Sequence, residues 1–290
     1  MKSNTDMTGY ARSGELKIFY RRFGGNRGMP IVIVHGLSYF SYDWIGIASA
    51  LASKRPVVAI DMRGFGESDW SVPGNYSPEA NSADLIAVLD ALGWQQAALL
   101  GHSMGGRHCT YCAFANKERV AGLISVDFAP AVAPAGSARV ASFVGNTPDH
   151  FRTVEDAMTY LNEDSHTSVS EQARSRLGMY LKETDKGLAI KRDPYFKAYF
   201  KQILETGKRP PQAIDFWAVL RSVSCPTLIV RGTESDMFSA DIAAKLRSDV
   251  PAAQLVEITA GHNIPGEAPE QLIEVVDSFM ADVDHRSNSH

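Results

Sequence analysis

Residues 101–106 read Gly-His-Ser-Met-Gly-Gly and follow directly on the apolar stretch Ala97–Leu100. The apolar stretch predicts a buried strand, and the residues after Gly106 predict a helix. Ser103 then stands on a sharp turn between a strand and a helix, where flanking glycines avoid collisions across the turn. This arrangement predicts that the Ser103 hydroxyl is exposed above the end of a sheet.

The same alternation of short apolar strand and helical segment recurs along the chain. Further strands are expected at Ile31–Val34, Val57–Ile60, Leu123–Val126, Thr227–Val230 and Gln254–Ile258. Continuous apolar strands are typical of parallel sheets buried on both faces. Helical segments separate them, Ser82–Leu92 being the clearest. The pattern predicts an α/β fold with a mostly parallel central sheet and helices on both faces.

The alternation stops between about residues 130 and 222, where helix-start signals replace strands. These signals are Thr153 with Asp156, Ser168 with Glu171, and Asp193-Pro194, with Gly207 as a helix stop. We interpret residues 131–221 as a helical cap inserted after the sixth strand. Residues 1–130 and 222–282 then form the α/β core, and residues 283–290 a polar C-terminal tail.

Composition places the chain among ordinary globular proteins. Its 290 residues are 44% hydrophobic and 21% charged, with a net charge of -4. These values predict neither a nucleic-acid partner nor an anionic membrane partner. The polar N-terminus predicts no signal peptide, so a cytoplasmic location is expected. The expected partner is a small-molecule substrate; a homodimer is compatible with the sequence, which leaves the oligomeric state open.

Two of the three cysteines, Cys109 and Cys112, form a C-x-x-C pair. They fall on the helix expected after the serine turn, without a second ligand pair at metal spacing. We therefore expect packed, reduced thiols, since free cysteine behaves as a small buried hydrophobe. Neither a metal nor a cofactor is expected.

A serine hydroxyl needs a base to act as a nucleophile, and the base needs a residue that orients it. His262 follows the last expected strand, and Asp236 follows the strand before it. Because sites assemble at the carboxyl ends of parallel strands, these loops can meet Ser103. Asp236 ranks first as the orienting carboxylate, ahead of Asp127, which follows Leu123–Val126, and of Glu234.

Together these motifs resemble the α/β-hydrolase superfamily, in its branch of small esterases, lactonases, perhydrolases and C–C bond hydrolases. The resemblance covers roughly residues 30–130 and 223–280. It rests on His35-Gly36, Asp61 to Ser68, Gly101 to Gly106, Pro226 to Gly232 with Asp236, and Gly261-His262. It implies a catalytic triad of Ser103, His262 and Asp236. It also implies an oxyanion hole formed by the Leu37 and Met104 amides, with Ser38 as an alternative to Leu37, and an architectural Arg63.

Within that resemblance, the residue at the position of Ser103 restricts the reactions to be expected. Related dehalogenases and epoxide hydrolases have aspartate at this position, and dienelactone hydrolases have cysteine. C–C bond hydrolases usually carry Gly-x-Gly-Pro-Gly after the first strand and asparagine before the serine, whereas this chain has Gly36-Leu37-Ser38 and His102. The resemblance therefore implies hydrolysis of a carboxylic ester or lactone. The alternatives are amide, C–C or perhydrolytic chemistry, or a non-catalytic receptor that retains the fold.

Two groups of side chains are candidates for contact with substrate. The aromatic group either lines the substrate pocket as an apolar wall or packs in the core. It consists of Tyr39, Phe40, Phe128, Phe143 and Trp217. The arginines either contact an acidic substrate or lie on the solvated surface, and they are Arg107, Arg139 and Arg152.

Overall fold

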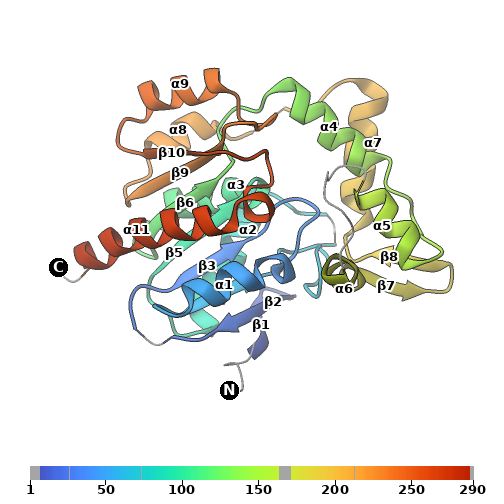
Figure 1. The fold of residues 1–290 in the computed structure, drawn as a ribbon, viewed down its shortest axis with the longest axis horizontal. Helices are drawn as coiled ribbons and strands as arrows, with labels where there is room; N and C mark the ends of the chain where they lie inside the picture. Colours follow the sequence, from blue (N-terminus) through green and yellow to red (C-terminus); the bar gives the residue numbers. More distant parts are fainter. Residues whose placement is uncertain (1–6, 26, 73, 163–170, 212, 288–290) are drawn as a thin grey trace.

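The computed structural model describes residues 7–25, 27–72, 74–162, 171–211 and 213–287. Its main sheet has eight strands in the order β1-β2-β4-β3-β5-β6-β9-β10 (Figure 1). The strands are β1 Met7–Ser13, β2 Leu16–Phe23, β3 Ile31–Val34, β4 Val57–Ile60, β5 Ala97–His102, β6 Val120–Val126, β9 Thr227–Gly232 and β10 Gln254–Ile258. From β4 through β10 neighbouring strands are parallel, which confirms the mostly parallel sheet.

The two antiparallel strands at one edge, β1 and β2, were not expected from the sequence. They form a hairpin with Met7 opposite Arg22, and β2 pairs antiparallel with β4. Both strands mix polar and apolar residues and are only partly buried. They therefore lack the continuous apolar pattern that marks the central strands.

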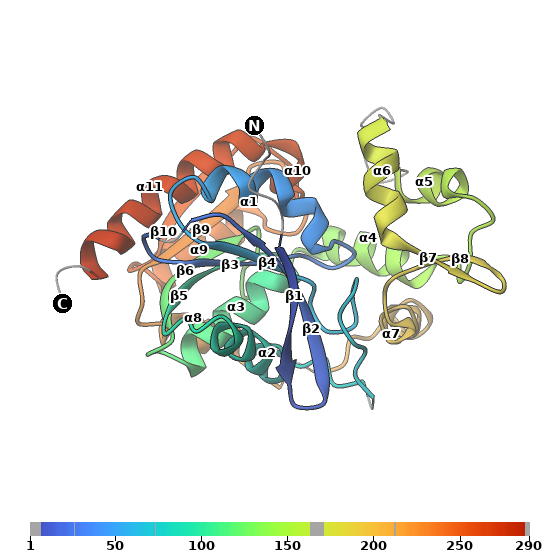
Figure 2. The same ribbon diagram turned by 90° about the horizontal axis from the view of Figure 1, so that it is seen from below.

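Side chains of the central strands alternate between two apolar cores, one on each face of the sheet. Ile31 and Ile33 pack with α1 (Ile45–Leu51) and α11 (Pro269–Ser287). Val32 and Val34 belong to the core that includes α2 (Pro78–Ala91) and α3 (Met104–Ala115). Figure 2 shows α1 and α11 on one side of the sheet and α2 and α3 on the other. Helices α8 (Phe216–Arg221), α9 (Ala240–Asp249) and α10 (Ile264–Glu267) complete the layers.

The segment after β6 lies beside the sheet (Figures 1 and 2) and carries most of the remaining elements. Its helices are α4 Pro134–Gly145, α5 Val154–Asn162, α6 Glu171–Tyr180 and α7 Pro194–Thr206. Asp193 caps α7 and Gly207 ends it in the left-handed region, as expected. A two-stranded hairpin, β7 Leu181–Thr184 with β8 Gly187–Ile190, was not expected. Of the capping pairs, Thr153 accepts from the Asp156 amide at 3.1 Å, whereas Ser168 lies outside the described residues.

The expected polar tail after residue 282 was wrong as far as Ser287, because α11 continues to that residue. Val283 is buried in the core, and the Asp284 carboxylate accepts a hydrogen bond from the Met29 amide at 2.7 Å. Asp284 also pairs with Arg55 at 2.9 Å. Apolar and charged contacts with the first half of the chain thus hold the end of α11. None of the helices in the described ranges has the length and apolar character needed to cross a membrane.

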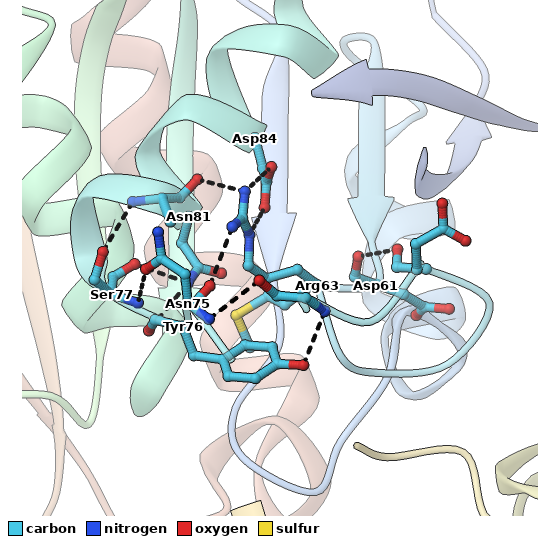
Figure 3. Close-up of polar contacts among 12 residues, drawn as sticks. Asp61, Arg63, Asn75, Tyr76, Ser77, Asn81 and Asp84 are labelled. Carbon is cyan, nitrogen blue, oxygen red and sulfur yellow. Dashed lines mark hydrogen bonds and ion pairs between the residues drawn. The ribbon is translucent and has the colours of Figure 1, made fainter. Parts of the chain in front are cut away.

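Arg63, in the loop after β4, joins that loop to α2. Its guanidinium makes two hydrogen bonds of 2.6 Å to the Asp84 carboxylate, and both side chains are buried. It also donates to the carbonyls of Asn75 and Ala80, each at 3.1 Å. Figure 3 shows the Arg63 guanidinium facing Asp84 within this network. The architectural role expected of Arg63 is confirmed.

Replacing Arg63 by methionine should lower the free energy of unfolding by about 3 to 5 kcal/mol, because Asp84 would remain buried without its partner. Urea denaturation followed by circular dichroism measures this change. The control is Lys54→Met, which removes an exposed pair with Asp277 and should cost about 1 kcal/mol or less. Equal stability of the two variants would contradict the role assigned to Arg63.

Candidate active site

Ser103 lies on the turn between β5 and α3 in a strained backbone conformation, with φ 53° and ψ -116°. Its amide donates to the Val126 carbonyl at 2.9 Å, which fixes the turn against β6. A Cβ on Gly105 would lie 2.3 Å from the Val34 carbonyl oxygen, and one on Gly101 would lie 2.5 Å from the Gly105 backbone. The glycines are therefore required by close backbone approach, as the sequence predicts.

Three side chains from separate strand ends form a chain of hydrogen bonds. His262 Nε2 lies 2.9 Å from Ser103 Oγ, and His262 Nδ1 lies 2.6 Å from Asp127 Oδ2. Ser103 follows β5, Asp127 follows β6 and His262 follows β10. The predicted pairing of Ser103 with His262 is present, but the carboxylate is Asp127, which ranked second.

Asp127 is held firmly in this position. Its side chain is fully buried, and its backbone adopts a positive φ of 46° at the end of β6. Oδ1 accepts from the Gly232 amide at 2.9 Å, and Oδ2 also accepts from the Ser235 hydroxyl at 2.5 Å. The carboxylate thus joins the loop after β9 to His262.

The assignment of Asp236 as the orienting carboxylate is therefore corrected. Asp236 forms a bidentate pair with Arg139 of α4, with distances of 2.7 and 3.0 Å. This hydrogen bonding lowers the pKa of the Asp236 carboxyl. The physical reason lies in the loop after β9, where the Ser235 bond to Asp127 turns the next residue toward α4. Glu234, the third candidate, is exposed and lies at the cavity wall.

His102, inside the serine motif, supports His262 from a buried position that the sequence did not reveal. Its Nε2 donates to the His262 carbonyl oxygen at 2.8 Å. Burial lowers the pKa of His102 to about 3, so the ring is neutral. A Cβ on Gly36 would lie 2.7 Å from His102 Nδ1, so this ring also packs against the loop after β3.

The two amides expected to form an oxyanion hole lie on segments next to Ser103. Met104 is the first residue of α3, and its amide therefore has no partner within the helix. Leu37 lies in a turn closed by the Tyr39 amide on the Gly36 carbonyl at 3.2 Å, with Ser38 at φ 64°. Within the described ranges neither the Leu37 nor the Met104 amide donates a hydrogen bond to another protein atom. Both residues line the same cavity as Ser103.

That cavity, of about 1910 Å³, separates the strand ends from the inserted segment. Of the expected aromatic wall, Tyr39, Phe128 and Phe143 line it, whereas Phe40 is buried in the core and Trp217 lies elsewhere. Helix α7 adds four more aromatic side chains: Tyr195, Phe196, Tyr199 and Phe200. The insert therefore contributes a group of aromatic side chains to the cavity wall.

The three candidate arginines have different surroundings. Arg107 and Arg139 line the cavity, whereas Arg152 is exposed and pairs with Asp156 at 3.1 Å. Solvated surface is therefore the correct interpretation for Arg152 alone.

Arg192, at the start of the chain segment leading into α7, ties the insert to the loop beside Ser103. This buried guanidinium donates to the Ser38 hydroxyl at 2.5 Å and to the Thr147 hydroxyl at 3.0 Å. Burial lowers its pKa to about 10, so Arg192 remains charged near neutral pH. It therefore holds the turn that carries the Leu37 amide.

The cysteines of the C-x-x-C pair have the surroundings expected of packed thiols. Cys109 and Cys112 are buried and free in α3. Burial raises the pKa of Cys112 to about 11 and that of Cys109 well above its usual value. Among the described residues no group of three or more histidine, cysteine or acidic side chains is arranged to hold a metal ion.

Ser103 lies on a strained strand-to-helix turn, and the histidine and the carboxylate follow later strands of the same sheet. The site therefore belongs to the class that is built at the carboxyl edge of a parallel sheet. The family model for the alpha/beta hydrolase fold matches residues 29–269. The chain therefore belongs to the α/β hydrolase fold family.

Several relatives are similar over most of their length. The 3-hydroxybutyrate-oligomer hydrolase of Cupriavidus necator is 29% identical and covers 82% of this chain and 84% of the relative. The sn-1-specific diacylglycerol lipase ABHD11 of Mus musculus is 25% identical, and the match covers 92% of this chain and 86% of the relative. The crystal structure of E-2-(acetamidomethylene)succinate hydrolase superposes with a TM-score of 0.84 at 22% identity, covering 96% of this chain and 100% of that structure. The first two are hydrolases, and the last likeness shows the shared fold.

Substituting Gly105 by alanine should lower the free energy of unfolding by at least about 2 kcal/mol, because the new methyl group collides with the β3 backbone. Thermal and urea unfolding measure this loss. The matched control is Gly178→Ala in α6, where a Cβ meets open space. That variant should stay within about 1 kcal/mol of the parent, so a similar loss in both would contradict the steric argument.

Proposed function

We propose that this protein is a serine hydrolase that cleaves a carboxylic ester or lactone of a small organic substrate. The observation that carries the proposal is the continuous hydrogen-bonded chain from Ser103 Oγ through His262 to the buried Asp127 carboxylate. Nucleophilic catalysis by serine needs this order of nucleophile, base and orienting acid. The similarity to a diacylglycerol lipase supports ester chemistry.

The hydrogen bonds of the three side chains define the role of each one in the reaction. Asp127 accepts from His262 Nδ1–H, which leaves Nε2 free to take the Ser103 proton as Oγ attacks the substrate carbonyl. The carbonyl oxygen becomes an oxyanion beside the Met104 and Leu37 amides, and each such donor is worth about 3 kcal/mol. His262 then protonates the leaving alcohol, and water attacks the acyl-enzyme by the same route in reverse.

A fluorophosphonate probe tests the nucleophile directly. The parent protein should be labelled on Ser103 and should hydrolyse p-nitrophenyl esters, whereas Ser103→Ala should do neither. Mass spectrometry locates the label, and absorbance at the nitrophenolate band follows turnover. A folded parent protein that takes up no label and hydrolyses no ester would sink the proposal and favour a non-catalytic receptor.

Paired substitutions distinguish the two aspartates. Asp127→Asn should lower kcat by about 10⁴-fold, since the amide favours the wrong histidine tautomer. Asp236→Asn removes only the pair with Arg139 and should keep kcat within about tenfold of the parent, because Asp236 does not touch His262. Steady-state kinetics with one ester measures both. A larger loss in Asp236→Asn than in Asp127→Asn would reverse the assignment.

A further inference from the structure

Arg107 lies one helical turn after the nucleophile. Its amide donates to the Ser103 carbonyl oxygen at 3.1 Å, and both side chains line the cavity. Arg107 lies in the first turn of α3, and its side chain borders the same cavity as the Ser103 hydroxyl.

The guanidinium of Arg107 lacks the partners that a shielded cation normally has. Its Nε is shielded from solvent and has no hydrogen-bond acceptor within the described part of the chain. The contact it does make is with the ring of Phe216, whose centroid lies 4.9 Å from Cζ. Buried polar groups are nearly always hydrogen-bonded, so each exception calls for an explanation.

Other arginines in the cavity wall are already paired. Arg139 binds Asp236, Arg176 lies 3.4 Å from Asp43, and Arg209 donates to the Ser137 carbonyl at 3.3 Å. Arg192, which is more deeply buried, has two hydroxyl acceptors. The Nε of Arg176 also lacks an acceptor, but its guanidinium faces a carboxylate. Among the described arginines that line the cavity, Arg107 is thus the one whose guanidinium has neither an ion pair nor a hydrogen bond.

The positive charge of Arg107 also has no carboxylate partner at ion-pair distance within the described structure. Burial lowers the pKa of Arg107, while the more distant Tyr199 and Glu79 raise it. Glu79 is exposed and makes no ion pair with Arg107 within the described structure. An arginine stays protonated at neutral pH even when shifted, so a positive charge faces the cavity.

We propose that Arg107 binds a carboxylate group of the substrate, so that the enzyme prefers acidic esters. A guanidinium matches a carboxylate through two parallel N–H donors, and Phe216 holds the planar group from behind. The inference deepens the proposed function and rests on it, because it assigns a substrate class to the cavity that contains Ser103.

Matched esters test the preference. Mono-p-nitrophenyl adipate and p-nitrophenyl hexanoate differ only in a terminal carboxylate in place of a methyl group. A second pair, 4-acetoxybenzoate and its methyl ester, places the charge on the alcohol side. The parent protein should show a higher kcat/KM for the acidic member of at least one pair. Arg107→Met should lower that acidic-to-neutral ratio by about tenfold or more, mainly through KM.

Two further variants separate charge recognition from packing. Arg107→Lys keeps the charge without the planar fork and should give an intermediate ratio. Arg152→Met removes the same charge from an exposed site and should leave the ratio unchanged. Equal losses on acidic and neutral esters in Arg107→Met, or no acidic preference in either pair, would overturn the inference while leaving the hydrolase proposal intact.

Direct binding keeps the two proposals distinguishable if no ester is hydrolysed. Titration calorimetry of adipate with the parent protein, with Arg107→Met and with Arg152→Met needs no turnover. Adipate should bind the parent and Arg152→Met alike and bind Arg107→Met about tenfold more weakly or not at all. Equal adipate affinity in all three proteins would refute the carboxylate site, whatever the result of fluorophosphonate labelling.

Discussion

The buried carboxylate of Asp127 is the point on which the rest of the site depends. It accepts hydrogen bonds from the last residue of β9 and from the loop after it, and it lies against the histidine that follows β10. A fully buried carboxylate without such partners would be strongly unfavourable. The loops of two strands must therefore close on it, and their closure brings His262 to Ser103. The strain at Ser103 and at Asp127 is tolerated because the flanking strands are buried on both faces of the sheet.

Much of this arrangement could be predicted from the chain itself. The six predicted strands of the parallel sheet and the serine turn follow from local pattern, and they lie where expected. The hairpin Met7–Phe23 could not be predicted in this way, because its burial comes from pairing with a strand some 40 residues later rather than from its own pattern.

The prediction of Asp236 rather than Asp127 as the orienting carboxylate was wrong for a related reason. Asp127 and Asp236 both follow strands of the same edge, so position along the chain does not separate them. Tertiary contacts distinguish the two aspartates, because the Ser235 hydroxyl donates to Asp127 and Arg139 of the insert pairs with Asp236. An arginine nearly a hundred residues away along the chain thus decides which aspartate is left for the histidine. The carboxylate site proposed at Arg107 depends on tertiary packing in the same way, because Phe216 of the insert packs against Arg107 of α3.

The anchoring of α11 has a consequence for how the protein is made. This helix supplies Leu272, Val276, Phe279 and Met280 to the core on one face of the sheet, and Asp284 binds the Met29 amide near the start of β3. During synthesis from the N-terminus, the central strands emerge long before the helix that covers them. The nascent chain must therefore keep the part of the sheet that α11 covers exposed until this helix leaves the ribosome. Apolar surface exposed during folding makes a chain prone to aggregate.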